Sequence, residues 1–478
     1  MMPAPGAPGG TSWPRWRVFP VLALGTIMAT LDVSVVNIAL PTLSRSFGVP
    51  LTTVEWVVLA YVLTITGLLL ALGRLADRLG RRRVYGSGLA VFTLASALCA
   101  AAPGAGALIA ARTLQGLGAA MMTANSAALL IASFPPGERG RALGAFGAAV
   151  GAGLALGPAL GGLVVQSLSW RWIFTLNLPL GLLALALLRD RLPADPPRAT
   201  GPRPHLAGAA LWCAALMLLM LALSRGPARG WGPDGVGPLF GIAVALMGLF
   251  ALLERRTADP LLPLADLTGP LGIAVTLTLI GNLVSIAVAF HLPLYLEEVL
   301  GFGAGRSGAW LAVLPGTALV MAPLAGRGSD HWGVRPLTVT GFALTAVGLG
   351  LLAALGTQPQ PVRILAGMIV VGVGQGLFAV PNSRALLSAV PAERLGFANG
   401  LQGTMRNLGI AGGAGLTAAL LASRFAAHGG GTLGAGTLAP GGRLAFANAT
   451  AETYLVMAAI ATLGALLALR GGPPGAEA

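Results

Sequence analysis

Long apolar runs separated by short connections set the strongest limit on what this chain can fold into. A helix needs about 20 apolar residues to cross a bilayer. Only 10% of the residues are charged, against about 25% in a soluble domain. The runs do not alternate strictly in polarity, which favours helices over the strands of a barrel. We therefore predict an all-α membrane protein with 14 transmembrane helices, at 18–40, 53–72, 84–102, 104–126, 141–164, 172–189, 206–224, 236–254, 271–295, 307–326, 337–356, 362–388, 397–424 and 450–470.

A charged segment occurs twice in the chain. Gly73 to Arg83 reads G-R-L-A-D-R-L-G-R-R-R, and Gly326 to Arg335, which begins 253 residues later, reads G-R-G-S-D-H-W-G-V-R. Two glycines, two arginines and one aspartate keep their places in both copies. A second pair repeats in the same order, N-S-A-A-L-L from 125 and N-S-R-A-L-L from 382. Internal repeats of this kind are typical of transporters built from two parallel halves.

The repeat predicts where the chain divides. Each copy of the charged segment lies between the second and third of six expected helices, so we place two six-helix halves at 18–189 and 271–470. The linker at 190–270 then carries two additional transmembrane helices. Residues 1–17 and 471–478 are left as tails.

Arginine sets the expected orientation. The chain carries 30 lysine and arginine residues, all of them arginine, and a formal net charge of +14. They are spread over the connections rather than gathered on one face, which excludes nucleic acid as a partner. With the N-terminus inside, 19 arginines fall on the inner side and eight on the outer side, as the positive-inside rule requires. We therefore expect an integral protein of the cytoplasmic membrane with both termini in the cytoplasm.

Cysteine and histidine give no sign of a cofactor. Cys99 and Cys213 each stand alone in an apolar run, and the four histidines are scattered. The sequence contains no metal-ligand spacing, nucleotide loop or nucleophile constellation. We expect no cofactor, no bound metal and no enzymatic activity.

Asp32 is the one acid placed deep within an expected helix. A charged side chain at that depth costs roughly 2.5–3.5 kcal/mol on insertion scales, and removal from water favours the neutral form of a carboxyl. Asp32 is therefore a candidate for carrying the proton in proton-coupled transport. The alternative is a structural acid that stays paired with an arginine. Arg112, an always-charged side chain within a span, needs a carboxylate, a carbonyl or water beside it.

Four further segments give the chain a family resemblance. They are L-D-V-S-V-V-N-I-A-L-P from Leu31, R-T-L-Q-G-L-G-A-A from Arg112, G-L-A-L-G-P-A-L-G-G from Gly153 and W-R-W-I-F-T-L-N-L-P from Trp170. Together with the segment at Gly73, they make the chain resemble the major facilitator superfamily. Within it, the chain is similar to the drug:proton antiporter family with 14 spanning helices, over nearly its whole length.

The resemblance implies roles for particular residues. Asp32 would serve in coupling and in recognising cationic substrates, and Arg112 in proton transfer. The antiporter motif marks exchangers off from symporters; it comprises Gly153, Gly157, Pro158, Gly161 and Gly162. The charged segment would form a cytoplasmic loop that latches the halves in the outward-facing state, through Gly73, Arg74, Asp77, Gly80, Arg81, Arg82 and Asp330. From its residues alone, Asp77 either accepts from an arginine or sits at a helix N-terminus, and the weaker second copy makes Asp330 the lesser candidate.

Several other polar residues in or beside the spans are candidates for a substrate cavity. They are Asn37, Trp56, Tyr61, Gln115, Asn282, Gln402 and Arg406. For each of them, packing or a local hydrogen bond is the alternative.

These observations favour a proton-driven exporter of drug-like, amphipathic or cationic compounds, working as a monomer in the lipid bilayer with a small-molecule substrate and protons as its partners. One alternative keeps the fold and makes the chain a symporter or facilitator for a nutrient. The other is a membrane receptor or scaffold that does not transport.

Overall fold

The chain folds as a bundle of long helices. The computed structural model describes residues 15–195, 206–257, 259–358, 360–430 and 440–470. The first expected half contains α1 (Phe19–Phe47), α2 (Leu51–Leu79), α3 (Arg81–Ala101), α4 (Ala105–Ala132), α5 (Arg139–Ser167), α6 (Arg171–Thr175) and α7 (Asn177–Arg191). The linker contains α8 (Leu206–Arg229) and α9 (Gly237–Glu254). The second half contains α10 (Pro270–Leu294), α11 (Ala304–Leu311), α12 (Val313–His331), α13 (Val334–Ala353), α14 (Pro361–Ser388), α15 (Leu395–Ala427) and α16 (Pro440–Arg470).

The expected count of 14 spans agrees with these helices. Within the described residues, 13 helical stretches are long and apolar enough to cross a membrane, with α6–α7 and α11–α12 each forming one span. The 29-residue α5 makes the fourteenth. A helix pairs its backbone N–H and C=O groups within itself, which suits lipid because lipid offers them no partner.

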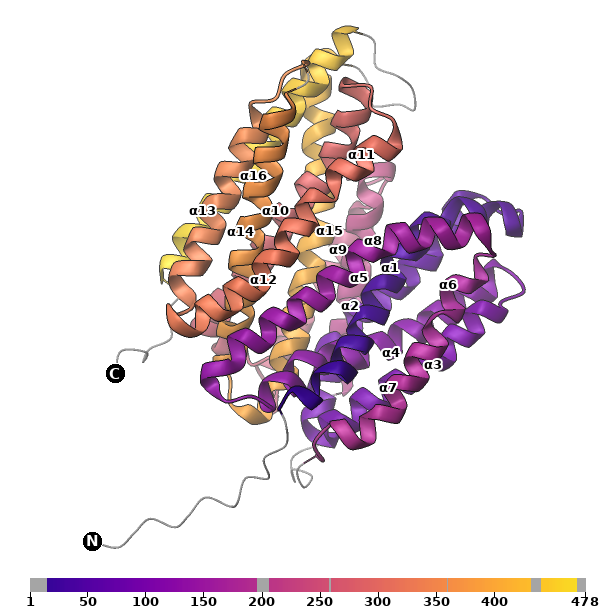
Figure 1. Ribbon diagram of the computed structural model, residues 1–478, viewed down its shortest axis with the longest axis vertical. Coiled ribbons are helices and arrows are strands. Elements are labelled where there is room, and N and C mark those ends of the chain that lie inside the picture. Colours follow the sequence, from indigo (N-terminus) through magenta and orange to yellow (C-terminus); the bar gives the residue numbers. More distant parts are fainter. Residues whose placement is uncertain (1–14, 196–205, 258, 359, 431–439, 471–478) are drawn as a thin grey trace, which may run out of the picture.

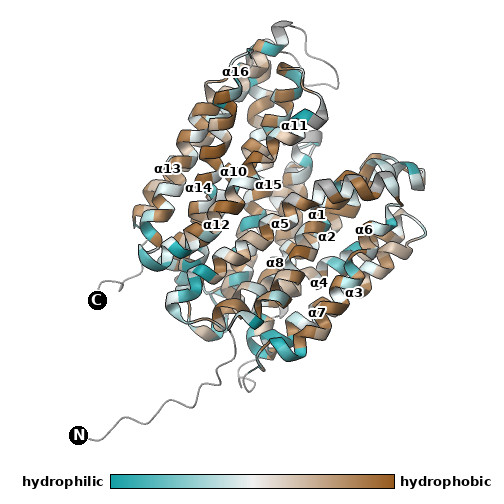
Figure 2. Ribbon diagram, in the orientation of Figure 1, coloured by the Kyte–Doolittle hydropathy of each residue, from teal (hydrophilic) through white to brown (hydrophobic). Residues whose placement is uncertain are grey.

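The helices form two groups that meet along two contacts (Figure 1). Helix α5 of the first group packs against α12 of the second, and α2 packs against α15. The inserted pair α8–α9 lies against this second contact, because α8 packs on both α2 and α15. We call the end of the bundle where α1 begins and α16 ends the terminal side. The hydropathy colouring places hydrophilic residues at helix ends, most clearly on that side (Figure 2).

The two groups are joined from mid-depth to the terminal side. Hydrogen bonds between them include Thr66 with Asn407 near mid-depth and Asn399 with the carbonyl of Thr123 closer to the terminal side. In the described chain, no hydrogen bond joins the two groups nearer the opposite side. There the ribbons of the two groups diverge (Figure 1).

The charged segment is mostly helical, and the expectation of a loop was wrong. Its first seven residues belong to α2 and its last three begin α3, so Gly80 alone lies between them. Gly80 has φ +106° and Gly333, its counterpart in the second copy, has φ +80°. Positive φ is inexpensive only for glycine, which explains why this residue is the same in both copies.

Candidate functional site

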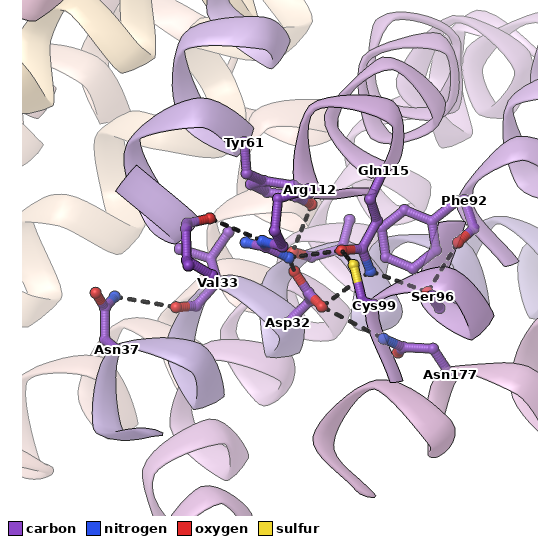
Figure 3. Close-up of polar contacts among 12 residues, drawn as sticks. Asp32, Val33, Asn37, Tyr61, Phe92, Ser96, Cys99, Arg112, Gln115 and Asn177 are labelled. Carbon is purple, nitrogen blue, oxygen red and sulfur yellow. Dashed lines mark hydrogen bonds and ion pairs between the residues drawn. The ribbon is translucent and has the colours of Figure 1, made fainter. Parts of the chain in front are cut away.

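Asp32 and Arg112 form an ion pair inside the first group of helices. Asp32 lies near the middle of α1 and Arg112 in α4, and both side chains are 0% exposed. Nη1 of Arg112 donates directly to Oδ2 of Asp32 (Figure 3). Both sequence candidates for proton coupling are thus in contact with one another, and neither faces water in this arrangement.

Further donors hold the Asp32 carboxylate. Gln115 Nε2 donates to Oδ1 at 3.1 Å, and Asn177 Nδ2, from α7, donates to the same oxygen at 3.4 Å. Gln115 in turn donates to Ser96 of α3 at 2.9 Å. The carboxylate therefore accepts from α4 and α7, and through Gln115 it is connected to α3.

Arg112 is held from several directions. Its Nε donates to the carbonyl of Val57 at 2.9 Å, and Nη1 also donates to Gln115 Oε1 at 2.7 Å. The guanidinium lies over the ring of Tyr61, 4.1 Å from the centroid. Its Nη2, however, is buried and has no hydrogen-bond partner among the described residues.

Each charge of the pair compensates the other, and either one buried alone would destabilise the protein. Removing one partner of a buried pair typically destabilises a protein by about 3–5 kcal/mol, because the other charge stays buried and uncompensated. A proton on Asp32 would likewise remove the charge that holds Arg112. The arrangement can therefore couple the protonation of one carboxyl to the packing of the helices that surround it.

The antiporter motif packs on α1 beside Asp32. A Cβ atom on Gly153 would overlap Thr30, and one on Gly157 would overlap Ser34. A Cβ on Gly161 would come within 3.1 Å of Val35. These glycines therefore let α5 approach α1 at the two turns that flank Asp32, as expected for a small-residue packing face. The side-chain surroundings of Pro158 and Gly162 lie outside the described residues.

Gly157→Ala is expected to force α1 away from α5. We expect a loss of about 1–3 kcal/mol in stability, typical of an overpacked interior, and slower transport. Thermal unfolding of the purified protein in detergent measures the first effect. Gly248→Ala in α9 is the matched control, because its added Cβ meets no atom within 4 Å. Equal unfolding temperatures for the two variants would contradict this account of the motif.

Asp77 and Asp330 bind the helix N-termini of the opposite group. Asp77, in α2, accepts from the backbone N–H groups of Gly396 at 2.9 Å and Phe397 at 2.7 Å, at the start of α15. Asp330, in α12, accepts from Gly140 and Arg141 at 2.9 Å each, at the start of α5. A carboxylate at a helix N-terminus is favoured by the helix dipole and the free N–H groups. We call these two contacts the aspartate clamps.

Each clamp aspartate also pairs with an arginine, but the two arginines come from different positions in the fold. Arg81, one turn after Asp77, lies 2.7 Å from it. The equivalent position in the second copy is Val334, and Asp330 instead pairs at 3.0 Å with Arg384 of α14. Asp77 thus contacts both an arginine and a helix N-terminus, the two partners that the sequence suggested as alternatives. The arrangement gives no reason to rank Asp77 above Asp330, and the role of Arg384 was missed from sequence.

Residues of the linker contact the first copy of the segment. Asp259, between α9 and α10, accepts from Arg74 at 3.1 Å and forms an ion pair with Arg78. Asp195, after α7, accepts from the backbone N–H groups of Arg82 at 2.8 Å and Arg83 at 3.0 Å. Neither aspartate could be recognised from the sequence, because an acid in a connection carries no signal that identifies its partner.

The predicted cavity residues do not form one site. Tyr61 and Gln115 belong to the network around Asp32. Asn37 is exposed and donates to Val33 on its own helix, and Asn282 donates to Thr278 in the same way. The remaining three lie elsewhere: Trp56 has the guanidinium of Arg225 over its ring at 4.9 Å, Gln402 donates to Ser383 of α14, and Arg406 lies half-buried in α15.

Comparison with known proteins decides the family. The family model described as Major Facilitator Superfamily matches residues 22–414 and 293–477. The chain belongs to the major facilitator superfamily.

Individual members of the superfamily with different named roles resemble the chain. The methylenomycin A resistance protein of Streptomyces coelicolor is 37% identical over 81% of this chain and 82% of its own length. The riboflavin transporter RibZ of Clostridioides difficile is 30% identical over 83% of this chain and 86% of its own length. Among solved structures, the proton:xylose symporter XylE matches with a TM-score of 0.66 at 17% identity, covering 95% of each chain. The family makes this chain a membrane transporter.

Proposed function

We propose that the protein is a proton-coupled antiporter that exports drug-like, amphipathic compounds across the cytoplasmic membrane by alternating access. The observation that carries the proposal is the buried Asp32–Arg112 pair, held at 0% exposure between helices of the first group. A carboxyl in such a site changes the charge balance of its surroundings when it gains a proton. Each proton that enters the cell supplies about 2.3 kcal/mol per 100 mV of membrane potential.

The two groups of helices are in contact at the terminal side and diverge at the opposite side, which supports an outward-facing conformation. The arginine distribution predicts that this side is cytoplasmic, and both aspartate clamps lie there. In this state, a proton from outside would neutralise Asp32 and release Arg112 from it. After the switch, loss of the proton to the cytoplasm would restore the pair and leave the transporter ready for substrate.

The named relatives favour export of a drug-like compound without deciding it. A methylenomycin resistance protein is among them, and the antiporter motif packs tightly against the helix that bears Asp32. The riboflavin transporter among the relatives keeps the nutrient symporter as the second candidate. The expected preference for cations is not part of this proposal, since Arg112 already neutralises Asp32.

Inverted membrane vesicles test the direction of coupling. A drug-susceptibility panel in an efflux-deficient host first identifies a compound to which the protein confers resistance. In vesicles with an acidic lumen, an antiporter accumulates that compound and makes the lumen less acidic as it enters. A protonophore should abolish the accumulation. Acidification of the lumen on substrate entry would instead indicate symport, and a panel with no resistance would count against export.

A further inference from the structure

Arg406 stands out among the arginines that the sequence places within spans. Arg112 is paired with Asp32, and Arg384 with Asp330. Arg406 has no hydrogen bond and no ion pair in the described part of the chain. It lies 11 residues after the start of α15 at Leu395, or about 17 Å along the helix axis, and so well inside the bundle. A charge at such depth is costly without a partner or water.

The neighbours of Arg406 on α15 show which way it points. Gly403 faces Leu69 of α2 on one flank, and Gly409 faces Asn282 of α10 on the other. Gly415, which lies half a turn away in angle, faces α8. Arg406 therefore points toward the space between the two groups of helices and away from the inserted pair.

Exposure along the same face agrees with this direction. Ile410, one turn further from the terminal side, is 41% exposed. Helix α15 is surrounded by α2, α4, α8, α10, α14 and α16, so an opening on this face leads to the interior of the bundle and not to lipid.

Acids on the surrounding helices do not reach Arg406. Asn407, the next residue, donates to Thr66 of α2 at 2.9 Å. The two acids of α2, Glu55 and Asp77, are each 11 residues from Thr66, or about 17 Å along the helix. Asp77 also accepts from the N-terminus of α15 in its clamp.

The acid of α16 is likewise paired elsewhere, because Glu452 forms ion pairs with Arg424 and His428.

The space between the groups is therefore positive at this depth. Asp32 and Arg112 cancel one another and are both fully buried, which leaves Arg406 as the net charge. A guanidinium presents a planar fork of donors that fits a carboxylate or phosphate in bidentate fashion. Ile410, one turn away on the same face and 41% exposed, offers apolar surface for the body of an amphipathic molecule.

We propose that Arg406 receives the anionic group of the substrate, so that the transported compounds are amphipathic organic anions bearing a carboxylate or phosphate group. This inference rests on the proposed export function and names its substrate class. The substrate class also determines how much net charge crosses the membrane in each transport cycle. Exchange of one proton for one monoanion carries two positive charges inward per cycle, whereas exchange for a monocation carries none.

Counterflow exchange in liposomes tests the inference without a proton gradient. The probes are two dyes with the same xanthene ring system, the anion carboxyfluorescein and the cation rhodamine 6G. The wild-type protein should exchange carboxyfluorescein and not rhodamine 6G. Arg406→Gln should raise the KM for the anion about 10- to 100-fold, as expected for the loss of charged hydrogen bonds, and Arg406→Lys should restore most of it. Arg424→Gln removes a charge from the same helix near its other end and should leave exchange unchanged.

The outcomes separate this inference from the proposed function. Exchange of rhodamine 6G alone, no exchange of carboxyfluorescein, or an unchanged KM in Arg406→Gln would overturn the anion assignment. Equal loss with Arg406→Lys and Arg406→Gln would overturn it as well, since charge would then not be what matters. Arg406-dependent exchange of the anion, combined with accumulation that a protonophore does not affect, would uphold the inference and refute proton coupling.

Discussion

Asp32→Asn is expected to abolish proton-driven export while the protein still folds and inserts. Asparagine keeps the size of the side chain and one oxygen that can accept from Arg112, which limits the cost of burying the guanidinium without its carboxylate, but it cannot carry a proton. Without coupling, the accumulation ratio loses the contribution of one proton, about 2.3 kcal/mol at 100 mV, which is about 50-fold. Accumulation in inverted vesicles measures this ratio directly.

Two control measurements distinguish loss of coupling from a folding defect. The amount of Asp32→Asn in the membrane and its elution as a single species in detergent should match the wild-type protein. Counterflow exchange, which needs no proton gradient, should continue in the variant. Normal protonophore-sensitive accumulation by Asp32→Asn would refute the role of Asp32, and the structural ion pair would then be the correct interpretation.

Loss of an aspartate clamp is expected to shift the protein away from the arrangement described here. Asp77→Asn replaces a charged acceptor of two backbone N–H groups by a neutral amide with a single acceptor oxygen. Hydrogen bonds to charged groups contribute about 1.5–3 kcal/mol each, so a loss of about 3 kcal/mol is expected. That changes the ratio of the two conformations by about 100-fold. Asp330→Asn should act similarly, because Asp330 also accepts from two backbone N–H groups at a helix N-terminus.

Distances across the side opposite the termini report this shift. Spin labels at Thr52 of α2 and Arg306 of α11 lie in different groups and at exposed positions near that side. Electron–electron double resonance should show one longer distance in the wild-type protein and a shorter population in Asp77→Asn. Asp190→Asn is the control, because it removes an exposed acid from the end of α7 and leaves both clamps intact. Identical distance distributions for all three proteins would contradict the latch.

Much of the fold could be predicted because it depends on local composition. Apolar length located the start of most helices to within three residues, although α16 begins at Pro440 and not near 450, and α1 and α2 each end seven residues later than expected. Glycine at 80 and 333 signalled a repeated backbone turn, and both residues have positive φ. The long-range partners could not be predicted in this way. That Asn177 donates to Asp32, or that Arg384 replaces Arg81 in the second clamp, depends on how distant helices pack.

The charge of the substrate also could not be predicted from the sequence, because it depends on which side chains pair across distant helices. From the sequence, the family resemblance implied that Asp32 recognises cationic substrates. The contact with Arg112 cancels that charge, and only the structure shows that Arg406 has no partner among the described residues. Charge at a buried site is a property of the pair and not of either residue.

Proton release on substrate binding tests most directly whether Asp32 gives up its proton as substrate binds. The protein is purified in detergent in weakly buffered solution with a pH-indicator dye, and an exported compound is added at each of a series of starting pH values. We expect the release of about one proton per bound substrate molecule from the wild-type protein, and none from Asp32→Asn, which still binds the compound. Equal proton release from both proteins, or uptake of protons by the wild-type protein, would show that Asp32 does not have this role.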